Sequence, residues 1–348
     1  MKYQVISFLS QSKEFILDIF PQFQDKKCYL VSHSDLDGIG ARIVFEYYFM
    51  SIFKEVKIFN TSKYDMADFN QSELKDFDFL FFTDLTPPTR EFYQSCLDTN
   101  PNLQIYIWDH HIGSKQTLGD LPNYFYDNTK CGTQIFFDWI CGDLQQANAR
   151  ISRCIYQFIE LVNTYDLFLT ESALWSSAKG LSSILYGMVD WKAKLDDTHK
   201  YNKFIDLQLK KFNLAKSFFF TDMELSIKQK AEIKEKTLFT KAIKEIKIRK
   251  DSLGRNYGYV ELDSKLSIVI HLLLRHFGEN LIYIIGHSTW KEKALGERNG
   301  ELSLRCGKNF YVSEIAKLHN GSGHKCASGC KLSLEDFEKL KKGEIHLV

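Results

Sequence analysis

Two short segments of this 348-residue chain are dense in side chains that bind hard metal ions. They are His33-Ser34-Asp35-Leu36-Asp37-Gly38 and Asp109-His110-His111. Carboxylates and imidazoles without thiolates favour Mn²⁺ or Mg²⁺, with Fe²⁺ or Co²⁺ as further options. Each segment directly follows an apolar, β-rich run, so we expect the two to form the walls of one metal site. Such a site predicts hydrolytic chemistry.

The first segment allows two interpretations. If the backbone stays extended, His33, Asp35 and Asp37 point to the same side of the chain, because side chains alternate along a strand. Gly38 and Gly40 would then let the chain turn into a helix at little steric cost. Alternatively, an aspartate before a glycine caps or turns the chain and binds no metal. The segment alone leaves both interpretations open.

Two further aspartates could complete a dinuclear site. Asp84 follows the apolar run 79–83, and two metal ions a few ångström apart need a bridging carboxylate of this kind. Asp166 ends a stretch with helical periodicity. Taken singly, Asp84 is explained as well by a cap or turn, and Asp166 by a helix end. Only the combination with the two ligand-rich segments predicts metal binding.

The elements that must position these ligands form an α/β pattern. Apolar β-rich runs at 28–31, 56–59, 77–83 and 105–108 alternate with amphipathic stretches. This alternation predicts a parallel sheet with helices on its faces. Ligands of such sheets bind at the carboxyl ends of the strands. We therefore expect the polar residues to converge on one edge of the sheet.

The length of the chain predicts two domains, with the active site in the cleft between them. We expect a catalytic metal-binding domain over 1–191, which becomes helical after residue 132, and a helical linker over 192–250. A smaller α/β domain that binds substrate is expected over 251–348. In that domain the pattern indicates strands near 257–262, 282–286 and 301–305, with helices near 267–277 and 312–319.

The formal net charge of +1 conceals an uneven distribution. Acidic residues predominate over 1–190, and lysines predominate over 191–250. An acidic domain that holds cations, followed by a basic segment, suits a substrate with phosphates. A solvated lysine-rich helix explains most of these lysines equally well.

Composition excludes several classes of protein. No stretch approaches the roughly 20 apolar residues of a membrane helix, and Met1–Leu17 lacks the pattern of a signal peptide. We therefore expect a cytoplasmic protein without a membrane partner. The eight cysteines contain no Cys-x-x-Cys pair, so reduced thiols are expected rather than disulfides or a zinc site.

Taken in order along the chain, the motifs resemble those of the DHH phosphoesterase family, which includes single-strand exonucleases, nano-RNases and type II pyrophosphatases. The N-terminal motifs of the resemblance are His33-x-Asp35-x-Asp37-Gly38, Asp84, Asp109-His110-His111 and Asp166. The C-terminal motifs, Ser303-Leu304-Arg305 and 320–329, resemble the associated DHHA1 substrate domain. The resemblance thus covers nearly the whole chain, from residue 33 to residue 329.

Within this family the chain resembles the nano-RNase B type of short-oligonucleotide hydrolase. That similarity is carried by the segment 33–40, Thr83-Asp84-Leu85, Cys131-Gly132-Thr133 at a helix start, and Tyr165-Asp166-Leu167-Phe168. The type II pyrophosphatases are disfavoured because their first motif is usually spaced His-x-x-x-Asp-x-Asp.

The resemblance implies two divalent metal ions, Mn²⁺ first, with Mg²⁺ or Co²⁺ as alternatives. Its implied ligand sets are His33, Asp35 and Asp84 for one ion, and Asp37, Asp84, His110 and Asp166 for the other. Asp109 would orient an imidazole. His111 would stabilise the charge on the phosphate or pass a proton to the leaving oxygen. A histidine that merely packs against the site is the alternative for His111.

In the second domain, the resemblance implies a phosphate clamp. Arg305 would hold a phosphate through its planar guanidinium group. Backbone N–H groups of Gly321, Ser322 and Gly323 would bind phosphate beside His324. Ser322 departs from the family, which usually has a third glycine there, and its side chain could crowd the loop. A clamp at a fixed distance from the metals favours short substrates.

The resulting hypothesis is an Mn²⁺-dependent phosphodiesterase that hydrolyses short single-stranded oligonucleotides by attack of a metal-activated water on phosphorus. A phosphatase for 3′-phosphoadenosine phosphate, or a phosphodiesterase for linear or cyclic dinucleotides, would use the same metals. A non-catalytic nucleotide-binding module is a third alternative, although none of the six ligands is missing. The sequence leaves open the choice of RNA or DNA, the polarity of cleavage, and whether the protein is a homodimer.

Overall fold

The structure is a computed structural model that describes residues 16–61, 66, 68–146, 152–189, 198–262, 266–288, 301–307 and 310–348. The chain divides into two compact units, Met1–Lys228 and Gln229–Val348. Each unit has its own sheet and its own hydrophobic core.

A five-stranded sheet in the order β2-β1-β3-β4-β5 forms the centre of the first unit. Its strands are β1 Lys27–His33, β2 Glu55–Thr61, β3 Phe79–Thr83, β4 Gln104–Asp109 and β5 Tyr124–Tyr126. All neighbouring strands are parallel, as the sequence predicts. The short strand β5 is not among the predicted ones.

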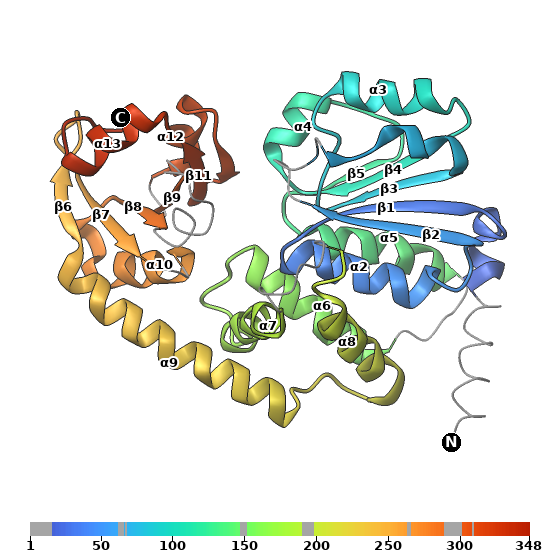
Figure 1. The fold of residues 1–348 in the computed structure, drawn as a ribbon. Coiled ribbons are helices and arrows are strands. Elements are labelled where there is room, and N and C mark those ends of the chain that lie inside the picture. Colours follow the sequence, from blue (N-terminus) through green and yellow to red (C-terminus); the bar gives the residue numbers. More distant parts are fainter. Residues whose placement is uncertain are drawn as a thin grey trace. The chain divides into compact units, whose positions relative to one another are not determined.

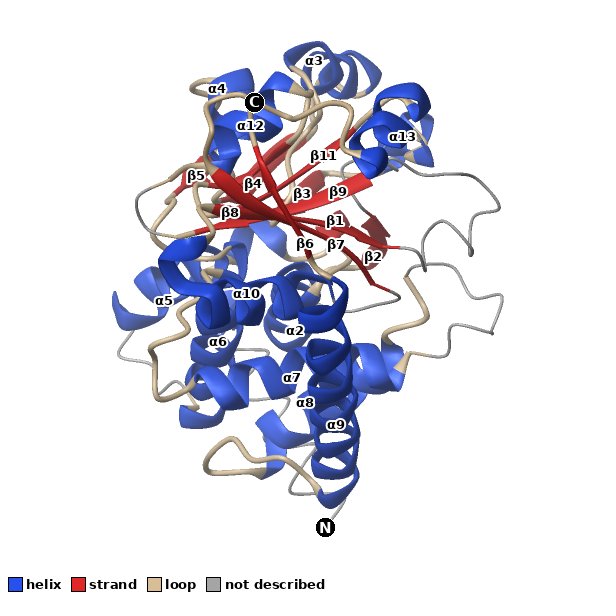
Figure 2. Ribbon diagram, turned by 90° about the vertical axis from the view of Figure 1, so that its left-hand side faces the viewer, coloured by secondary structure: helices blue, strands red, loops and turns tan. Residues whose placement is uncertain are grey.

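Helices cover both faces of this sheet. They are η1 Pro21–Phe23, α2 Leu36–Phe49, η3 Gln71–Asp76, α3 Arg90–Thr99, α4 Ile112–Leu118, α5 Gly132–Gln146, α6 Arg153–Asp166, α7 Trp175–Met188 and α8 Asn202–Leu214. Helices α3 and α4 lie on one side of the sheet, and α2 and α5 on the other (Figure 1). Figure 2 shows α6, α7 and α8 on the same side as α2.

Alternating strand residues supply the two cores of the first unit. Leu30, Phe81 and Trp108 pack toward the helices α2 and α5, whereas Val31 and Phe82 pack on the opposite face with α3. These central strands are buried on both faces, which explains their nearly continuous apolar sequences. Burial of each such side chain contributes about 1.5–3 kcal/mol to stability.

The segment 192–250 contains two helices among its described residues. Helix α8 contributes Phe204, Ile205 and Phe212 to the core of the first unit. Helix α9, Asp222–Glu245, crosses the boundary between the units. Its C-terminal part packs on the second core through Leu238 and Ala242.

The second unit contains a six-stranded mixed sheet in the order β10-β11-β9-β8-β7-β6. The strands are β6 Lys247–Lys250, β7 Asn256–Leu262, β8 Tyr283–Ser288, β9 Glu301–Cys306, β10 Ser322–His324 and β11 Ala327–Lys331. Its helices are α10 Leu266–Phe277, η4 Gly278–Asn280, α12 Val312–Leu318 and α13 Leu334–Lys342. Helices α12 and α13 pack on one face of the sheet and α10 on the other.

All eight cysteines are free thiols. No helix among the described residues is long and apolar enough to cross a membrane.

Candidate metal centre

The predicted ligands follow three adjacent strands at the carboxyl edge of the first sheet. His33 is the last residue of β1, Asp84 follows β3, and Asp109 ends β4. Since these strands are parallel neighbours, their carboxyl ends lie side by side. The main-chain N–H of Asp84 also donates to the carbonyl of Trp108, 2.8 Å away, which ties the two strand ends together.

Of the two interpretations of the first motif, the extended backbone does not hold beyond His33, and Asp35 caps a helix. Strand β1 ends at His33, Asp35 is the N-cap of α2, and Asp37 lies in the first helical turn. Asp35 Oδ1 accepts hydrogen bonds from the main-chain N–H groups of Asp37 and Gly38, each at 3.1 Å. Its Oδ2 lies 3.0 Å from His33 Nδ1. Asp35 therefore caps the helix with one oxygen and faces the site with the other.

The glycines of this motif let the chain turn into α2 without a steric clash, in agreement with the sequence interpretation. A Cβ atom on Gly38 would lie 2.2 Å from the carbonyl oxygen of His33. A Cβ atom on Gly40 would lie 2.7 Å from Thr133 Oγ1. Contacts this short do not occur between real atoms, so α2 can begin here only without these side chains.

Asp84 lies at the centre of the site in an unusual conformation. Its φ of 54° is left-handed, which is uncommon for residues other than glycine and is found at functional sites. The residue is 1% exposed, and neither carboxylate oxygen receives a hydrogen bond from the described residues. Its Oδ2 lies 3.4 Å from His33 Nδ1, and its Oδ1 lies 3.3 Å from His110 Nε2. Asp84 thus faces a histidine on each side.

His110 lies beside a second set of carboxylates. Its Nε2 lies 3.4 Å from Asp166 Oδ2 and 3.8 Å from Asp37 Oδ2. Asp37 is held by the start of α5, where its two oxygens accept hydrogen bonds from Gly132 N at 2.6 Å and Thr133 N at 2.8 Å. Asp166 is the last residue of α6. Residues far apart in the sequence therefore meet around one imidazole.

Three groups of ligand atoms result, and within each group all atoms lie within 4.8 Å of one another. The groups are His33, Asp35 and Asp84; Asp37, His110 and Asp166; and Asp84, His110 and His111. All six residues that the resemblance implies as ligands are thus brought together. The oxygen- and nitrogen-only donor set fits divalent cations such as Mn²⁺ or Mg²⁺.

The electrostatics of the site also fit bound cations. Burial raises the pKa of Asp84 well above its ordinary value, and the neighbouring carboxylates of Asp37 and Asp35 raise it further. Burial raises the pKa of Asp166 to about 7, although the charge of His110 opposes this effect. Without cations, this environment disfavours the ionised form of both carboxylic acids. Bound divalent cations would relieve this excess of negative charge.

His111 is held at the rim of the site. Its Nδ1 lies 2.6 Å from Asp109 Oδ1, and its main-chain N–H donates to Asp109 Oδ2 at 3.3 Å. Burial lowers the pKa of His111, but the charge and hydrogen bond of Asp109 outweigh this effect, so that the pKa is raised overall. The imidazole side chain is 39% exposed, whereas Asp109 is fully buried. Asp109 therefore orients an imidazole that faces solvent.

Three supporting residues lie outside the predicted set. Gly132 and Thr133 hold Asp37, although the sequence indicated them only as a helix start. Tyr124 in β5 donates a hydrogen bond to Asp109 Oδ2 at 3.5 Å. No sequence signal marks Tyr124, because its strand is too short to be recognised.

Known proteins resemble this chain in sequence and in fold. No protein-family model matches the chain. A 3′,5′-cyclic-nucleotide phosphodiesterase from Helicobacter pylori is 21% identical over an alignment 343 positions long, in which 87% of this chain and 92% of that protein are covered.

Solved structures extend the similarity. The DHH domain of a member of a family of ribosomal proteins aligns with a TM-score of 0.60 and 12% identity, covering 98% of this chain and 91% of that one. The exonuclease RecJ bound to manganese aligns with a TM-score of 0.54 and 13% identity, covering 96% and 92%. The chain has the fold of these DHH-domain proteins. A pGpG-specific phosphodiesterase from Vibrio cholerae also aligns, with a TM-score of 0.52 and 13% identity over 91% of this chain and 97% of its own.

The DHH fold confirms the family resemblance at the level of architecture. The nano-RNase B subtype stays a prediction.

The second unit contains the residues predicted to bind phosphate. Arg305 lies in β9, and its Nη1 donates to the Leu304 carbonyl at 2.8 Å and to Ser303 Oγ at 3.2 Å. In the sheet register, Arg305 pairs with Ala327 of β11, which pairs with His324 of β10. Two strand spacings of about 4.8 Å separate the Arg305 and His324 backbones.

The chain requires glycine at two positions at and just before β10. A Cβ atom on Gly321 would lie 2.2 Å from the Gly329 carbonyl oxygen, and Gly323 has a φ of 136°. The side chains of Ser322 and His324 lie outside the part of the chain that the structure describes. How Ser322 affects the loop therefore stays a prediction.

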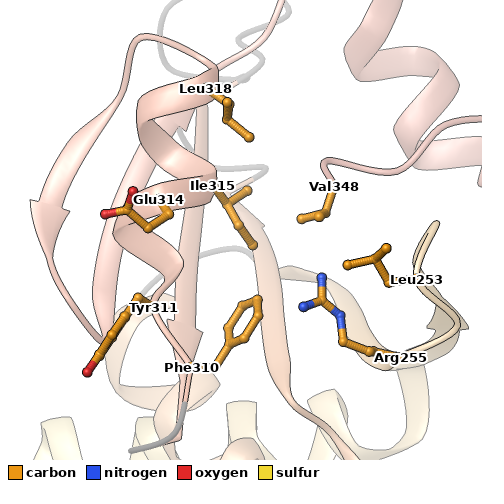
Figure 3. Close-up of a pocket in the computed structure, with 8 residues that line it drawn as sticks. All are labelled: Leu253, Arg255, Phe310, Tyr311, Glu314, Ile315, Leu318 and Val348. Atoms are coloured by element: carbon orange, nitrogen blue, oxygen red, sulfur yellow. The ribbon is translucent and has the colours of Figure 1, made fainter.

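A shallow pocket of about 340 Å³ lies elsewhere in the second unit. Figure 3 shows the Arg255 guanidinium group directed into it beside Phe310. Its lining is mostly apolar and consists of Leu253, Arg255, Phe310, Tyr311, Glu314, Ile315, Leu318 and Val348. None of the predicted phosphate-binding residues lines this pocket.

Proposed function

We propose that the protein is a metal-dependent phosphodiesterase of the nano-RNase type that hydrolyses short single-stranded oligonucleotides, with Mn²⁺ as the first candidate cation. One observation carries the proposal. Asp84 belongs both to the group with His33 and Asp35 and to a group with His110, as a bridging ligand between two cations must. The similarity to manganese-bound RecJ, an exonuclease, supports the choice of metal and of substrate class.

Cations held by these side chains would supply Lewis-acid activation of a water molecule and of the phosphate. The chain itself contributes position and proton transfer. Asp84 sets the separation between the two ligand groups. Asp109 accepts the Nδ1 proton of His111, which leaves Nε2 as the atom that contacts a phosphate oxygen. The Asp109 carboxylate stabilises a protonated His111 imidazole, which could stabilise negative charge or give a proton to the leaving oxygen.

The role of the second unit is part of the same proposal. We assign catalysis to 1–191, a linker to 192–250 and substrate binding to 251–348. Arg305 and the main-chain N–H groups of Gly321, Ser322 and Gly323, with His324, would bind a terminal phosphate. The adjacent register positions of β9, β11 and β10 support this assignment. A site of this kind selects substrates by the position of their phosphate groups.

A second candidate is a phosphodiesterase for cyclic nucleotides or for dinucleotides. It is favoured by the similarity to the Helicobacter pylori 3′,5′-cyclic-nucleotide phosphodiesterase over 87% of this chain. The pGpG-specific phosphodiesterase from Vibrio cholerae supports the dinucleotide form of this candidate. Both candidates use the same metal centre and differ only in the substrate bound.

The deciding experiment measures kcat/KM of the purified protein with Mn²⁺. The substrates are oligonucleotides of two to ten residues, cyclic mononucleotides, cyclic dinucleotides and 3′-phosphoadenosine phosphate. We expect the best short oligonucleotide to exceed the other classes by more than tenfold. A larger value for a cyclic nucleotide would replace the first candidate by the second.

The matched variant is Asp84→Asn, because asparagine tolerates the left-handed conformation of this position. We expect it to fold and to lose activity on every substrate. Full turnover by Asp84→Asn, or no hydrolysis of any substrate by the unsubstituted protein, would contradict the proposed function.

A further inference from the structure

Aromatic side chains lie directly beside the metal-ligand candidate Asp166. Tyr165 precedes it in α6, Phe168 follows the helix end, and Trp175 opens α7. The Trp175 ring is stacked on Tyr165, with centroids 6.0 Å apart and an interplanar angle of 11°. Phe168 contacts the same indole edge-on, with centroids 4.9 Å apart at 71°. We call Tyr165, Phe168 and Trp175 the aromatic platform.

All three rings of the platform are half-buried. Most large aromatic side chains of the first unit are instead fully enclosed, as Phe81, Phe136 and Trp108 are. Leu169, the next residue along the chain after Phe168, is also exposed. Tyr165 also packs against the core of this unit, yet all three rings keep a partly accessible surface beside Asp166.

Phe168 occupies a backbone position that favours glycine. It has a φ of 56° directly after the C-cap of α6. The Leu169 N–H donates to the Thr164 carbonyl at 3.0 Å, and the Phe168 N–H donates to the Tyr165 carbonyl at 3.1 Å. This pair of bonds is the Schellman motif, in which glycine is the usual left-handed residue. The phenyl ring is therefore retained against a local preference for glycine, which suggests a use for the ring.

Helix α7 carries a second aromatic residue on the face that carries Trp175. Tyr186 follows Trp175 by eleven residues, or about three helical turns, so the two lie on one face of α7. Helix α7 also packs against α6, which ends at the metal-ligand candidate Asp166.

We propose that the aromatic platform binds a nucleobase of the substrate by stacking beside the metal centre. The inference rests on the proposed function and specifies how the first unit recognises a nucleotide. Stacking on aromatic rings is tolerant of base identity, because every base has a π-face. The platform accordingly selects for the presence of a base adjacent to the scissile phosphate and discriminates weakly among the four bases.

The test compares ligands with and without a base. Binding of adenosine 5′-monophosphate and of ribose 5-phosphate is measured by calorimetry in the presence of Mn²⁺. In parallel, kcat and KM are measured for a diribonucleotide and for the same compound with abasic sites. The variants are Phe168→Gly, which keeps the left-handed backbone, Trp175→Ala, and Trp175→Phe, which keeps an aromatic ring. Phe219→Ala removes an exposed ring between α8 and α9 and is the control.

Stacking of one base changes affinity by about fivefold to 150-fold. We expect the unsubstituted protein to prefer the nucleotide over ribose 5-phosphate by at least about fivefold. Phe168→Gly and Trp175→Ala lose this preference and raise KM for the diribonucleotide, whereas its kcat changes little. For the abasic compound, both kcat and KM change little. Trp175→Phe retains part of the preference, and Phe219→Ala retains all of it.

Two results would overturn the inference: an equal loss for ligands with and without a base, or an unchanged preference in Phe168→Gly and Trp175→Ala. The calorimetric preference for the nucleotide is independent of turnover. The unsubstituted protein could hydrolyse no substrate and still prefer the nucleotide over ribose 5-phosphate in a way that depends on Phe168 and Trp175. That result would contradict the proposed function and support base binding by the aromatic platform.

Discussion

Gly132 lies so close to Asp84 that a Cβ atom on Gly132 would be 2.7 Å from the Cβ atom of Asp84. The same glycine donates its main-chain N–H to Asp37 Oδ2 at 2.6 Å. One residue at the start of α5 therefore controls the positions of two metal-ligand candidates. Its lack of a side chain is what lets α5 approach the strand ends.

Gly132→Ala is expected to displace Asp84 and lower kcat/KM about 100-fold, because a shift of about 1 Å in a reacting group has this effect. The affinity for Mn²⁺, measured by calorimetry, should fall in parallel. Gly142→Ala is the matched control, since Gly142 lies in the same helix with no atom within 4 Å of the added Cβ. Equal activity of Gly132→Ala and Gly142→Ala would show that the close approach of residue 132 to Asp84 does not matter for catalysis.

Asp109→Asn is expected to lower kcat about 10- to 100-fold while leaving the metal content unchanged, because Asp109 acts by orienting His111. His111→Gln should lower kcat at least as far. The double variant should be no worse than His111→Gln alone, since both substitutions remove one function. If the loss of kcat in the double variant equals the two single losses combined, Asp109 and His111 act independently. The measurement is kcat at saturating substrate, with metal content determined by elemental analysis.

Much of the first unit follows from local sequence patterns. The apolar runs that end in carboxylates or imidazole predict both the parallel sheet and the edge at which His33, Asp84 and Asp109 meet. The central strands are buried on both faces of the sheet, so they need apolar residues at nearly every position. This need produces the apolar runs that are visible in the sequence. Short elements such as β5, which contains Tyr124, carry no such signal.

The local conformation of the first motif could not be predicted in this way. Its His-x-Asp-x-Asp spacing is compatible with a strand, yet the chain turns into α2 directly after His33. The decisive factors are tertiary: Asp35 caps that helix, and Asp37 caps α5 from a distance of 95 residues in sequence. Nor does a sequence pattern reveal that Gly38 is needed for the close approach of α2 to the His33 carbonyl.

Asp251 in the second unit should make stability dependent on pH. Burial raises its pKa, but hydrogen bonds from Arg255 and from the Leu253 N–H outweigh burial and hold the pKa below the ordinary value of 3.8. Between these two pKa values the folded state binds fewer protons than the unfolded state. The stabilisation is therefore complete above pH 3.8 and is lost as the pH falls through the folded-state pKa.

Asp251→Asn is accordingly expected to lower the free energy of unfolding by about 1–3 kcal/mol at pH 7. The difference from the unsubstituted protein should shrink as the pH falls below 4. Urea denaturation between pH 3 and pH 7 measures this difference. A constant difference over that range would mean that the ionised carboxylate contributes nothing.

Removal of metal tests the dinuclear centre itself. Cations that bind only the folded protein stabilise it by about 2.7 kcal/mol at 100 times their Kd, so chelation should lower the Tm and added Mn²⁺ should restore it. Calorimetry should give two Mn²⁺ per chain. Because Asp84 faces both His33 and His110, Asp84→Asn should weaken both sites, whereas His33→Gln should weaken only one. Two sites of unchanged affinity in Asp84→Asn would exclude a bridging role for this carboxylate.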